Sequence, residues 1–206
     1  MVNNSFSFYC KSSNEFINQI KNWNNFDTKT TIDKVLGIKR YTNEFWTSKQ
    51  RASHSIHEVS YRACFKGELP NFFINRLTKE KDIVYDPFMG RGTTLIEAAI
   101  NLRNCFGNDI NPLSSALVEP RLHPPSIQDI KKRINSIKFN YEIKNKNKDL
   151  LVFYHHKTLR EIETYKNYFI KKINKESFDS IDNWIRMIVL NRLTGHSKGF
   201  FSVYTL

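Results

Sequence analysis

The fold of this chain is decided by the stretch Ile83-Val84-Tyr85-Asp86-Pro87-Phe88-Met89-Gly90-Arg91-Gly92-Thr93-Thr94. Its three apolar leading residues predict the end of a buried strand. Gly90 and Gly92 predict a tight turn, because a residue without Cβ adopts positive φ and lets a ligand approach the backbone. From Thr93 to Ile100 the apolar spacing becomes helical. Strand, glycine turn and helix in this order predict the first unit of a Rossmann-like α/β sheet.

A second acidic residue follows at the distance that such a fold requires. Asp109 comes after the short run 105–108 and precedes Ile110-Asn111-Pro112. In Rossmann-like folds a carboxylate at the tip of the second strand binds ribose hydroxyls. The glycine turn and this acid together indicate a ligand that carries an adenosine group.

Two common nucleotide motifs do not fit the glycine turn. The dinucleotide fingerprint has a third glycine, which allows close packing of the helix, and this chain has the bulky Leu95 there. A P-loop has Gly-Lys-Ser/Thr after four spacer residues, and here Thr93 follows Gly92. The turn therefore predicts neither a dinucleotide site nor a nucleoside triphosphate site.

The stretch 86–94 resembles the S-adenosylmethionine loop of the DNA methyltransferases that modify exocyclic amines, N4 of cytosine or N6 of adenine. Asp109-Ile110-Asn111-Pro112 resembles the second motif of that family, which holds the ribose. The resemblance covers about residues 60–120. It implies a Rossmann-like methyltransferase sheet, incomplete in this chain, with helical N-terminal and C-terminal additions. It also implies S-adenosylmethionine as cofactor and double-stranded DNA as partner.

The resemblance implies cofactor-binding roles for a set of residues. They are Asp86, Pro87, Phe88, Gly90, Gly92, Thr93, Thr94, Asp109, Asn111, Pro112, Phe65 and Pro70. In the family the first acid orients the methionine end and the loop passes beneath the cofactor. The two threonines, at a helix N-terminus, meet the methionine carboxylate. The second acid binds the ribose, Asn-Pro flanks the adenine, and the Phe and Pro before the loop close the methionine side.

The acceptor tetrapeptide of the resembling family is absent from these 206 residues. That motif is Asp, Asn or Ser, then Pro-Pro, then Tyr, Phe or Trp. Its polar side chain and a proline carbonyl accept hydrogen bonds from the base amine, and its ring stacks on a base pulled from the duplex. The only Pro-Pro here is Pro124-Pro125, between His123 and Ser126. No catalytic residue is therefore assigned, and a tetrapeptide, if one exists, is expected to follow Leu206.

Three functions stay open on the sequence. The chain is the cofactor-binding half of a split or truncated DNA amino-methyltransferase, with the catalytic half supplied in trans by a second subunit. Alternatively, it is an RNA methyltransferase of the guanine-N2 type, although Thr93-Thr94 favours the DNA enzymes. The third reading is an inactive cofactor-binding or DNA-binding remnant.

Composition agrees with a nucleic-acid partner. The chain has 32 Lys and Arg against 20 Asp and Glu, a net charge of +12 and a pI near 9.6. A basic protein of this kind binds polyanions with an affinity that falls as salt rises. Three widely spaced cysteines without a Cys-x-x-Cys pair predict neither zinc nor disulfides, and indicate reduced thiols in the cytoplasm. No apolar run is long enough to span a membrane.

The N-terminal residues 1–58 are predicted to form a helical cover, and residues 59–206 the methyltransferase domain. Helices are expected from Ser13 to about Trp23 and over Ile32–Leu36. Phe45 and Trp46 could stack on a base, but buried aromatic filler is preferred. His54 and His57 lie three apart without a third ligand, so they predict core or surface histidines and no metal site.

The residues after the second motif are predicted to be helical and basic. A helix is expected to end before Pro120, another to begin at Ser126 with Asp129 near a capping box, and two more over 159–169 and 180–194. Basic residues off the apolar stripe form a candidate DNA-backbone contact or a solvated face. They are Lys131, Lys132, Arg133, Lys138, Lys144, Lys146 and Lys148.

Overall fold

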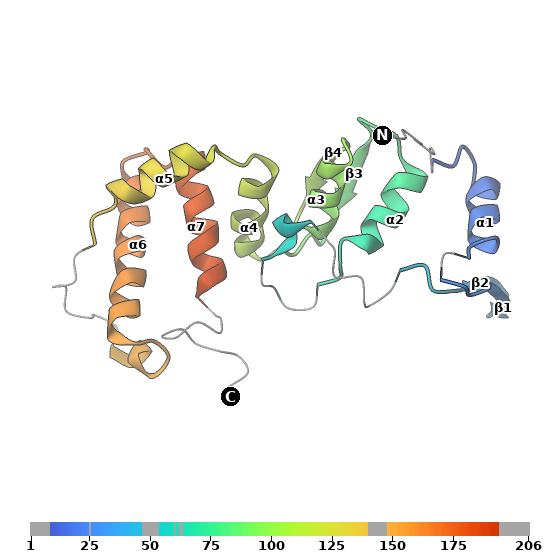
Figure 1. Ribbon diagram of the computed structural model, residues 1–206, viewed down its shortest axis with the longest axis horizontal. Helices are drawn as coiled ribbons and strands as arrows, with labels where there is room; N and C mark the ends of the chain where they lie inside the picture. The colour runs from blue at the N-terminus through green and yellow to red at the C-terminus, as the bar shows by residue number, and fades with distance from the viewer. Residues whose placement is uncertain are drawn as a thin grey trace. The chain divides into compact units, whose positions relative to one another are not determined.

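The computed structural model describes residues 9–24, 26–46, 54–59, 61, 64–139 and 148–193 (Figure 1). The chain divides into two compact units, residues 1–110 and residues 111–206. The described elements of the first unit are α1 (Ser13–Lys21), β1 (Thr31–Val35), β2 (Ile38–Thr42), the 3-10 turn η1 (Ser55–His57), α2 (Glu68–Leu77), β3 (Ile83–Asp86), α3 (Thr93–Ile100) and β4 (Asn104–Gly107). Those of the second are α4 (Pro112–Leu122), α5 (Ile127–Ser136), the 3-10 turn η2 (Lys148–Val152), α6 (His156–Asn174) and α7 (Ser180–Arg192).

The predicted strand, glycine turn and helix form as expected. Strands β3 and β4 pair in parallel, from Ile83 opposite Asn104 to Asp86 opposite Gly107, and α3 connects them. Helix α3 buries Leu95, Ile96 and Ala98, and Figure 1 shows it lying along the two strands. The class is therefore mixed α/β, built here on one β-α-β unit.

The strands are less buried than their apolar sequence predicts. Val84 is half-buried, but the alternate residues Ile83 and Tyr85 are 66% and 61% exposed, and Phe106 on β4 is 60% exposed. Since successive side chains of a strand point to opposite faces, one face of the pair carries these apolar side chains in the open. Among the described residues the parallel sheet has two strands, so the wider Rossmann-like sheet stays a prediction.

The first helix forms as predicted, with its cap one residue earlier. Ser12, and not Ser13, caps α1, and its hydroxyl accepts from the Glu15 amide at 3.2 Å. A Ser Oγ at this position satisfies an amide that has no partner within the helix. The helix packs towards α2 through Phe16 and Phe73, whose ring centroids lie 6.3 Å apart.

The helix predicted over Ile32–Leu36 is wrong, because this segment forms a β-hairpin. Strands β1 and β2 pair antiparallel around Leu36 and Gly37, which have φ of 51° and 81°. Two consecutive residues at positive φ form the two-residue turn whose twist matches that of a hairpin. Gly37 therefore closes a hairpin where the sequence reading took it as the end of a helix.

Aromatic side chains fill the space between α1, α2 and the segment after the hairpin. Phe45 and Trp46 pack on Phe72 with ring centroids 5.6 and 5.8 Å away, and Trp23 lies 5.2 Å from the same ring. The guanidinium of the buried Arg76 lies 4.0 Å from the centre of the Phe72 ring. Phe45 and Trp46 are thus packing residues, as the preferred prediction held.

In the second unit, α4 runs through a proline that was predicted to follow its end. Pro120 lies inside the helix, where it lacks the amide that would bond the carbonyl four residues earlier. Leu117 and Val118 are buried before it, and the buried Arg121 donates from Nε to the Leu117 carbonyl at 2.7 Å. Burial on both sides of the proline offsets the lost hydrogen bond.

The other predicted helices of this unit are confirmed. The Ser126 hydroxyl caps α5 and accepts from the Asp129 amide at 3.2 Å. Helices α6 and α7 cover the segments predicted from their apolar spacing, and Asp179 and Asp182 form a capping box at the start of α7. Gly195, expected to end α7, lies outside the described residues, as do Lys144 and Lys146.

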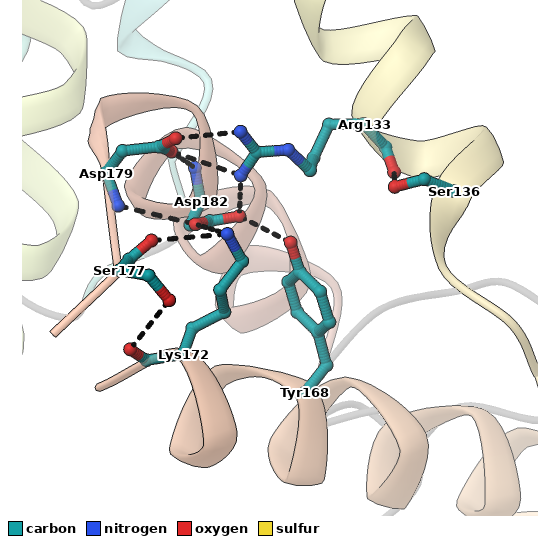
Figure 2. A network of polar contacts seen from close by, with 7 residues as sticks. All are labelled: Arg133, Ser136, Tyr168, Lys172, Ser177, Asp179 and Asp182. Carbon is teal, nitrogen blue, oxygen red and sulfur yellow. Dashed lines mark hydrogen bonds and ion pairs between the residues drawn. The ribbon is translucent and has the colours of Figure 1, made fainter. Parts of the chain in front are cut away.

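A buried carboxylate joins α5, α6 and α7 (Figure 2). Asp182 on α7 is fully buried, and its Oδ1 accepts from the Tyr168 hydroxyl at 2.6 Å and from Arg133. Lys172 Nζ lies 3.3 Å from its Oδ2. Arg133 also binds Asp179, and its Nη2 donates to Asp179 Oδ2 at 2.7 Å. Arg133 therefore joins α5 to two carboxylates at the start of α7, whereas the sequence left it open as a DNA-backbone contact or part of a solvated face.

This network predicts a change of stability in alkaline solution. Burial and the hydrogen bond to Asp182 raise the pKa of Tyr168 to about 12. A raised pKa in the folded state stabilises the fold fully below the unfolded value, near 10, and that contribution is lost as pH rises to about 12. We expect the thermal midpoint of wild type to fall more between pH 9 and pH 12 than that of Tyr168→Phe. Equal losses in the two proteins would contradict this assignment.

Among the described residues, no helix is both long enough and apolar enough to cross a membrane. The three cysteines lie in different surroundings: Cys10 is buried, Cys105 is half-buried and Cys64 is exposed, and no disulfide joins them.

Candidate functional site

The site begins where β3 ends. Asp86, the last residue of the strand, accepts at Oδ1 from the Phe88 amide at 3.0 Å and so shapes the turn that follows. Pro87 and Phe88 occupy this turn, and the Phe88 side chain is 86% exposed. The predicted loop thus exposes a large apolar side chain to solvent.

The glycine turn and the second acid meet in the structure. Asp109 Oδ2 accepts from the Gly90 amide at 2.8 Å, across 19 positions of sequence. The Met89 amide donates to the Asn108 carbonyl at 3.0 Å beside this contact. Gly90 and Gly92 have φ of 51° and 79°, where a side chain would be strained. The glycine turn and the segment around Asp109, which together predicted an adenosine ligand, are therefore hydrogen-bonded to each other.

Gly92 caps α3, so the first turn of that helix faces the loop. The Thr93 side chain is buried, and its hydroxyl accepts from Arg91 Nε at 3.1 Å. Thr94 is half-buried. The Thr93 hydroxyl thus holds the loop together, and the helix amides are the groups left to meet an anion.

Phe65 and Pro70 line an apolar pocket of about 510 Å³ together with Thr94. The remaining walls are side chains of α2 and β3, with Thr78 after the end of α2. The Phe65 side chain is 44% exposed and Pro70 is buried. The structure thus places both predicted residues near the start of α3.

Asn111 and Pro112 begin the second unit. The Asn111 side chain accepts from the Leu113 amide at 3.0 Å and caps α4, and Pro112 is the first residue of that helix. Proline suits this position because the first helical amide has no partner within the helix. Their predicted contact with an adenine stays a prediction.

Sequence reasoning missed a buried polar cluster next to the turn. His57 Nε2 lies 2.6 Å from Glu97 Oε1, with both side chains buried, and Asn71 Nδ2 donates to Glu97 Oε2 at 2.8 Å. His57 is thus a core histidine, as predicted, whereas His54 is exposed. Within the described part of the chain, no group of His, Cys, Asp and Glu could hold a metal ion. Periodicity gave no signal for the pairing, because its partners lie 40 positions apart.

Comparison with known proteins decides the family. The sequence profile described as DNA methylase matches residues 3–118, more than half of the chain, and includes both motifs of the site. The chain belongs to the DNA methylase family. No solved structure matches it.

Curated relatives of this DNA methylase are named as Type II methyltransferases. It is 32% identical over 111 residues to the Type II methyltransferase M.MjaII of Methanocaldococcus jannaschii, which covers 52% of the chain and 21% of that relative. It is 26% identical over 160 residues to the Type II methyltransferase M.MvaI of Kocuria varians, covering 76% of the chain and 31% of that relative. The matched part thus spans a fifth to a third of these two proteins.

Members of this family use S-adenosylmethionine as methyl donor, and the described residues fit that group. A Cβ built at Gly90 would lie 3.5 Å from the Tyr61 ring, an ordinary van der Waals distance, so it is the positive φ of 51° that favours glycine in this turn. Asp109 supplies a carboxylate for hydroxyl groups, and the start of α3 supplies amides for an anion. Phe88 and Ile110, which are 86% and 100% exposed, supply apolar surface beside them.

Proposed function

We propose that this chain binds S-adenosylmethionine and serves a DNA methyltransferase that modifies an exocyclic base amine. The main support for the proposal is the hydrogen bond from the Gly90 amide to Asp109, because it joins the acid expected to bind the ribose to the glycine turn. Family membership and relatives named as Type II methyltransferases support it.

Each group of the ligand has a counterpart in the proposed site. The Asp109 carboxylate accepts hydrogen bonds from ribose hydroxyls, and amides at Thr93 and Thr94 meet the methionine carboxylate. Asp86 orients the methionine end. Phe65 and Pro70 close that end of the site. When bound, the donor supplies an electrophilic methyl group on a sulfonium, and these residues bind and orient it.

The other predicted residues complete the site. Pro87 and Phe88 form the loop beneath the donor, and Gly90 and Gly92 let it approach the backbone. The pair Asn111-Pro112 flanks the adenine.

The wider architecture is also part of the proposal. Sheets of this class are covered on both faces, whereas Ile83, Tyr85 and Phe106 leave one face of β3 and β4 open. We assign residues 59–206 to a Rossmann-like methyltransferase domain whose sheet is wider than β3 and β4, and residues 1–58 to its cover.

The acceptor side of the reaction is proposed to come from elsewhere. These 206 residues contain no Pro-Pro followed by an aromatic residue. An acceptor motif from another segment, or from a second subunit in trans, would bind the flipped base and its amine. Cytosine N4 and adenine N6 are both compatible with this arrangement.

DNA is the proposed macromolecular partner. Residues 111–206 contain 17 Lys and Arg against 9 Asp and Glu, a net charge of +8 out of +12. Lys131, Lys132 and Lys138 are exposed, so they are candidates for phosphate contacts. Binding through such residues falls steeply with salt.

Isothermal titration of the full chain with S-adenosylmethionine tests the proposal. We expect saturable binding with a Kd on the order of micromolar, and no binding of ATP or NAD at the same concentrations. Transfer of a labelled methyl group to duplex DNA is expected only when a segment with the acceptor tetrapeptide is added. Absence of donor binding at millimolar concentration would overturn the proposed function.

A further inference from the structure

An arginine of the glycine turn holds the chain segment that precedes α2. The Arg91 guanidinium donates from Nη1 to the carbonyls of His57 and Val59, at 3.2 and 3.1 Å, and from Nη2 to that of Phe65 at 3.1 Å. Its Nε donates to Thr93 Oγ1 at 3.1 Å. A planar guanidinium offers five donors in a fixed geometry, whereas the lysine ammonium has three, so lysine cannot make these four hydrogen bonds together.

The same segment has a second anchor on α3. Glu97 binds His57 Nε2 at 2.6 Å and Asn71 Nδ2 at 2.8 Å, so one carboxylate fixes the segment and α2 together. The packing is close, because a Cβ on Gly67 would lie 2.5 Å from Glu97 Oε1. The segment is thus attached to α3 and to the turn before it.

These two anchors bring aromatic side chains to the glycine turn. The Tyr61 ring lies 3.5 Å from the position that a Cβ of Gly90 would occupy. The Phe65 carbonyl accepts from Arg91 and from the Thr93 hydroxyl, and the Phe65 ring is 44% exposed. One ring of the segment therefore covers the turn and the other lies near the first residue of α3.

We propose that Arg91 is a positioning residue for the methyl donor and that Tyr61 is a wall of the donor site. This inference rests on the proposed function, because it assigns the two residues to the same site. An aromatic face attracts a cation, and the donor carries a sulfonium. Arg91 acts through the segment: it binds the carbonyls that keep the Tyr61 ring against Gly90.

Titration calorimetry of Arg91 and Tyr61 variants tests the proposal. We expect Arg91→Ala and Arg91→Lys to weaken binding of S-adenosylmethionine about tenfold, Tyr61→Leu to do the same, and Tyr61→Phe to bind as wild type. Because Arg91 acts through Tyr61, the double variant Arg91→Ala with Tyr61→Leu should bind no more weakly than the weaker single variant. Tyr61→Leu should lose less affinity for S-adenosylhomocysteine, which has no sulfonium.

Arg103 provides the matched control. It also binds a threonine, donating from Nε to Thr78 Oγ1 at 3.0 Å and from Nη2 to the Thr78 carbonyl at 2.7 Å, but it lies after α3 and away from the glycine turn in sequence. Arg103→Ala should keep the donor affinity within about twofold, since it leaves the turn intact. Amide hydrogen exchange without ligand should rise at residues 57–59, 61, 64 and 65 in Arg91→Ala and stay unchanged there in Arg103→Ala.

The outcomes separate the two proposals. If wild type does not bind the donor, the proposed function fails and this inference fails with it. If wild type binds and Arg91→Ala binds equally well, the inference alone is overturned. Additive losses in the double variant, or equal losses for the two ligands in Tyr61→Leu, would also overturn it.

Discussion

Replacement of Asp182 by Asn is expected to unfold the second unit at a much lower denaturant concentration than wild type requires. The carboxylate is fully buried and binds Arg133, Tyr168 and Lys172 (Figure 2). Asn keeps the shape but removes the charge that compensates two cations from α5 and α6. Breaking a buried ion pair on one side costs about 3–5 kcal/mol. Denaturant unfolding of the full chain, followed by helical circular dichroism, measures the loss.

Replacement of Asp179, a more exposed partner of the same arginine, is the control for this variant. Asp179 Oδ2 accepts from Nη2 of the same Arg133 at 2.7 Å, but the Asp179 side chain is 44% exposed. Asn caps a helix as well as Asp does, so Asp179→Asn should cost less than about 1 kcal/mol. A loss of that size for Asp182→Asn as well would show that the buried network contributes little to stability.

Replacement of Asp109 by Ala is expected to give the largest loss of donor affinity. Under the proposed function the carboxylate holds the ribose, and in the structure it also fixes the Gly90 amide at 2.8 Å. Each hydrogen bond to a charged group contributes about 1.5–3 kcal/mol, so a loss of roughly 100-fold or more is expected. Titration calorimetry with S-adenosylmethionine measures it.

Two further variants separate binding from folding. Asp109→Asn keeps an acceptor for the Gly90 amide, so it should preserve the thermal midpoint and still bind the donor more weakly than wild type. Asp82 is exposed and accepts from the Lys79 amide at 2.8 Å, near the start of β3. Asp82→Ala should leave donor affinity unchanged. Unchanged affinity in Asp109→Ala would remove this acid from the site.

The two replacements with the largest expected effects both remove a carboxylate, but sequence analysis identified only Asp109 and not Asp182. Asp109 was singled out because it follows a predicted strand at the spacing of a known motif. Asp182 lies within a helix whose apolar spacing, from Ile181 to Val189, predicted the buried face. Helix α7 also buries Asp182 and Asn183, and no periodicity distinguishes a buried acid with partners from an exposed one.

The sequence by itself determined the β-α-β unit, the glycine turn and the family. These features depend on local chemistry: positive φ at Gly90 and Gly92, apolar spacing after Thr93, and caps such as Ser126. Such signals act over a few positions, so they can be read along the chain. The same local reading was wrong for the hairpin around Gly37, since one glycine suits both a helix end and a hairpin turn.

Only the tertiary structure decided which polar groups meet. It paired His57 with Glu97 across 40 positions, Arg91 with the Val59 carbonyl across 32, and Arg133 with Asp182 across 49. A charged or polar side chain is compatible with solvent at any of these places. It becomes buried and paired only when distant elements pack and exclude water, because a buried polar group needs a partner.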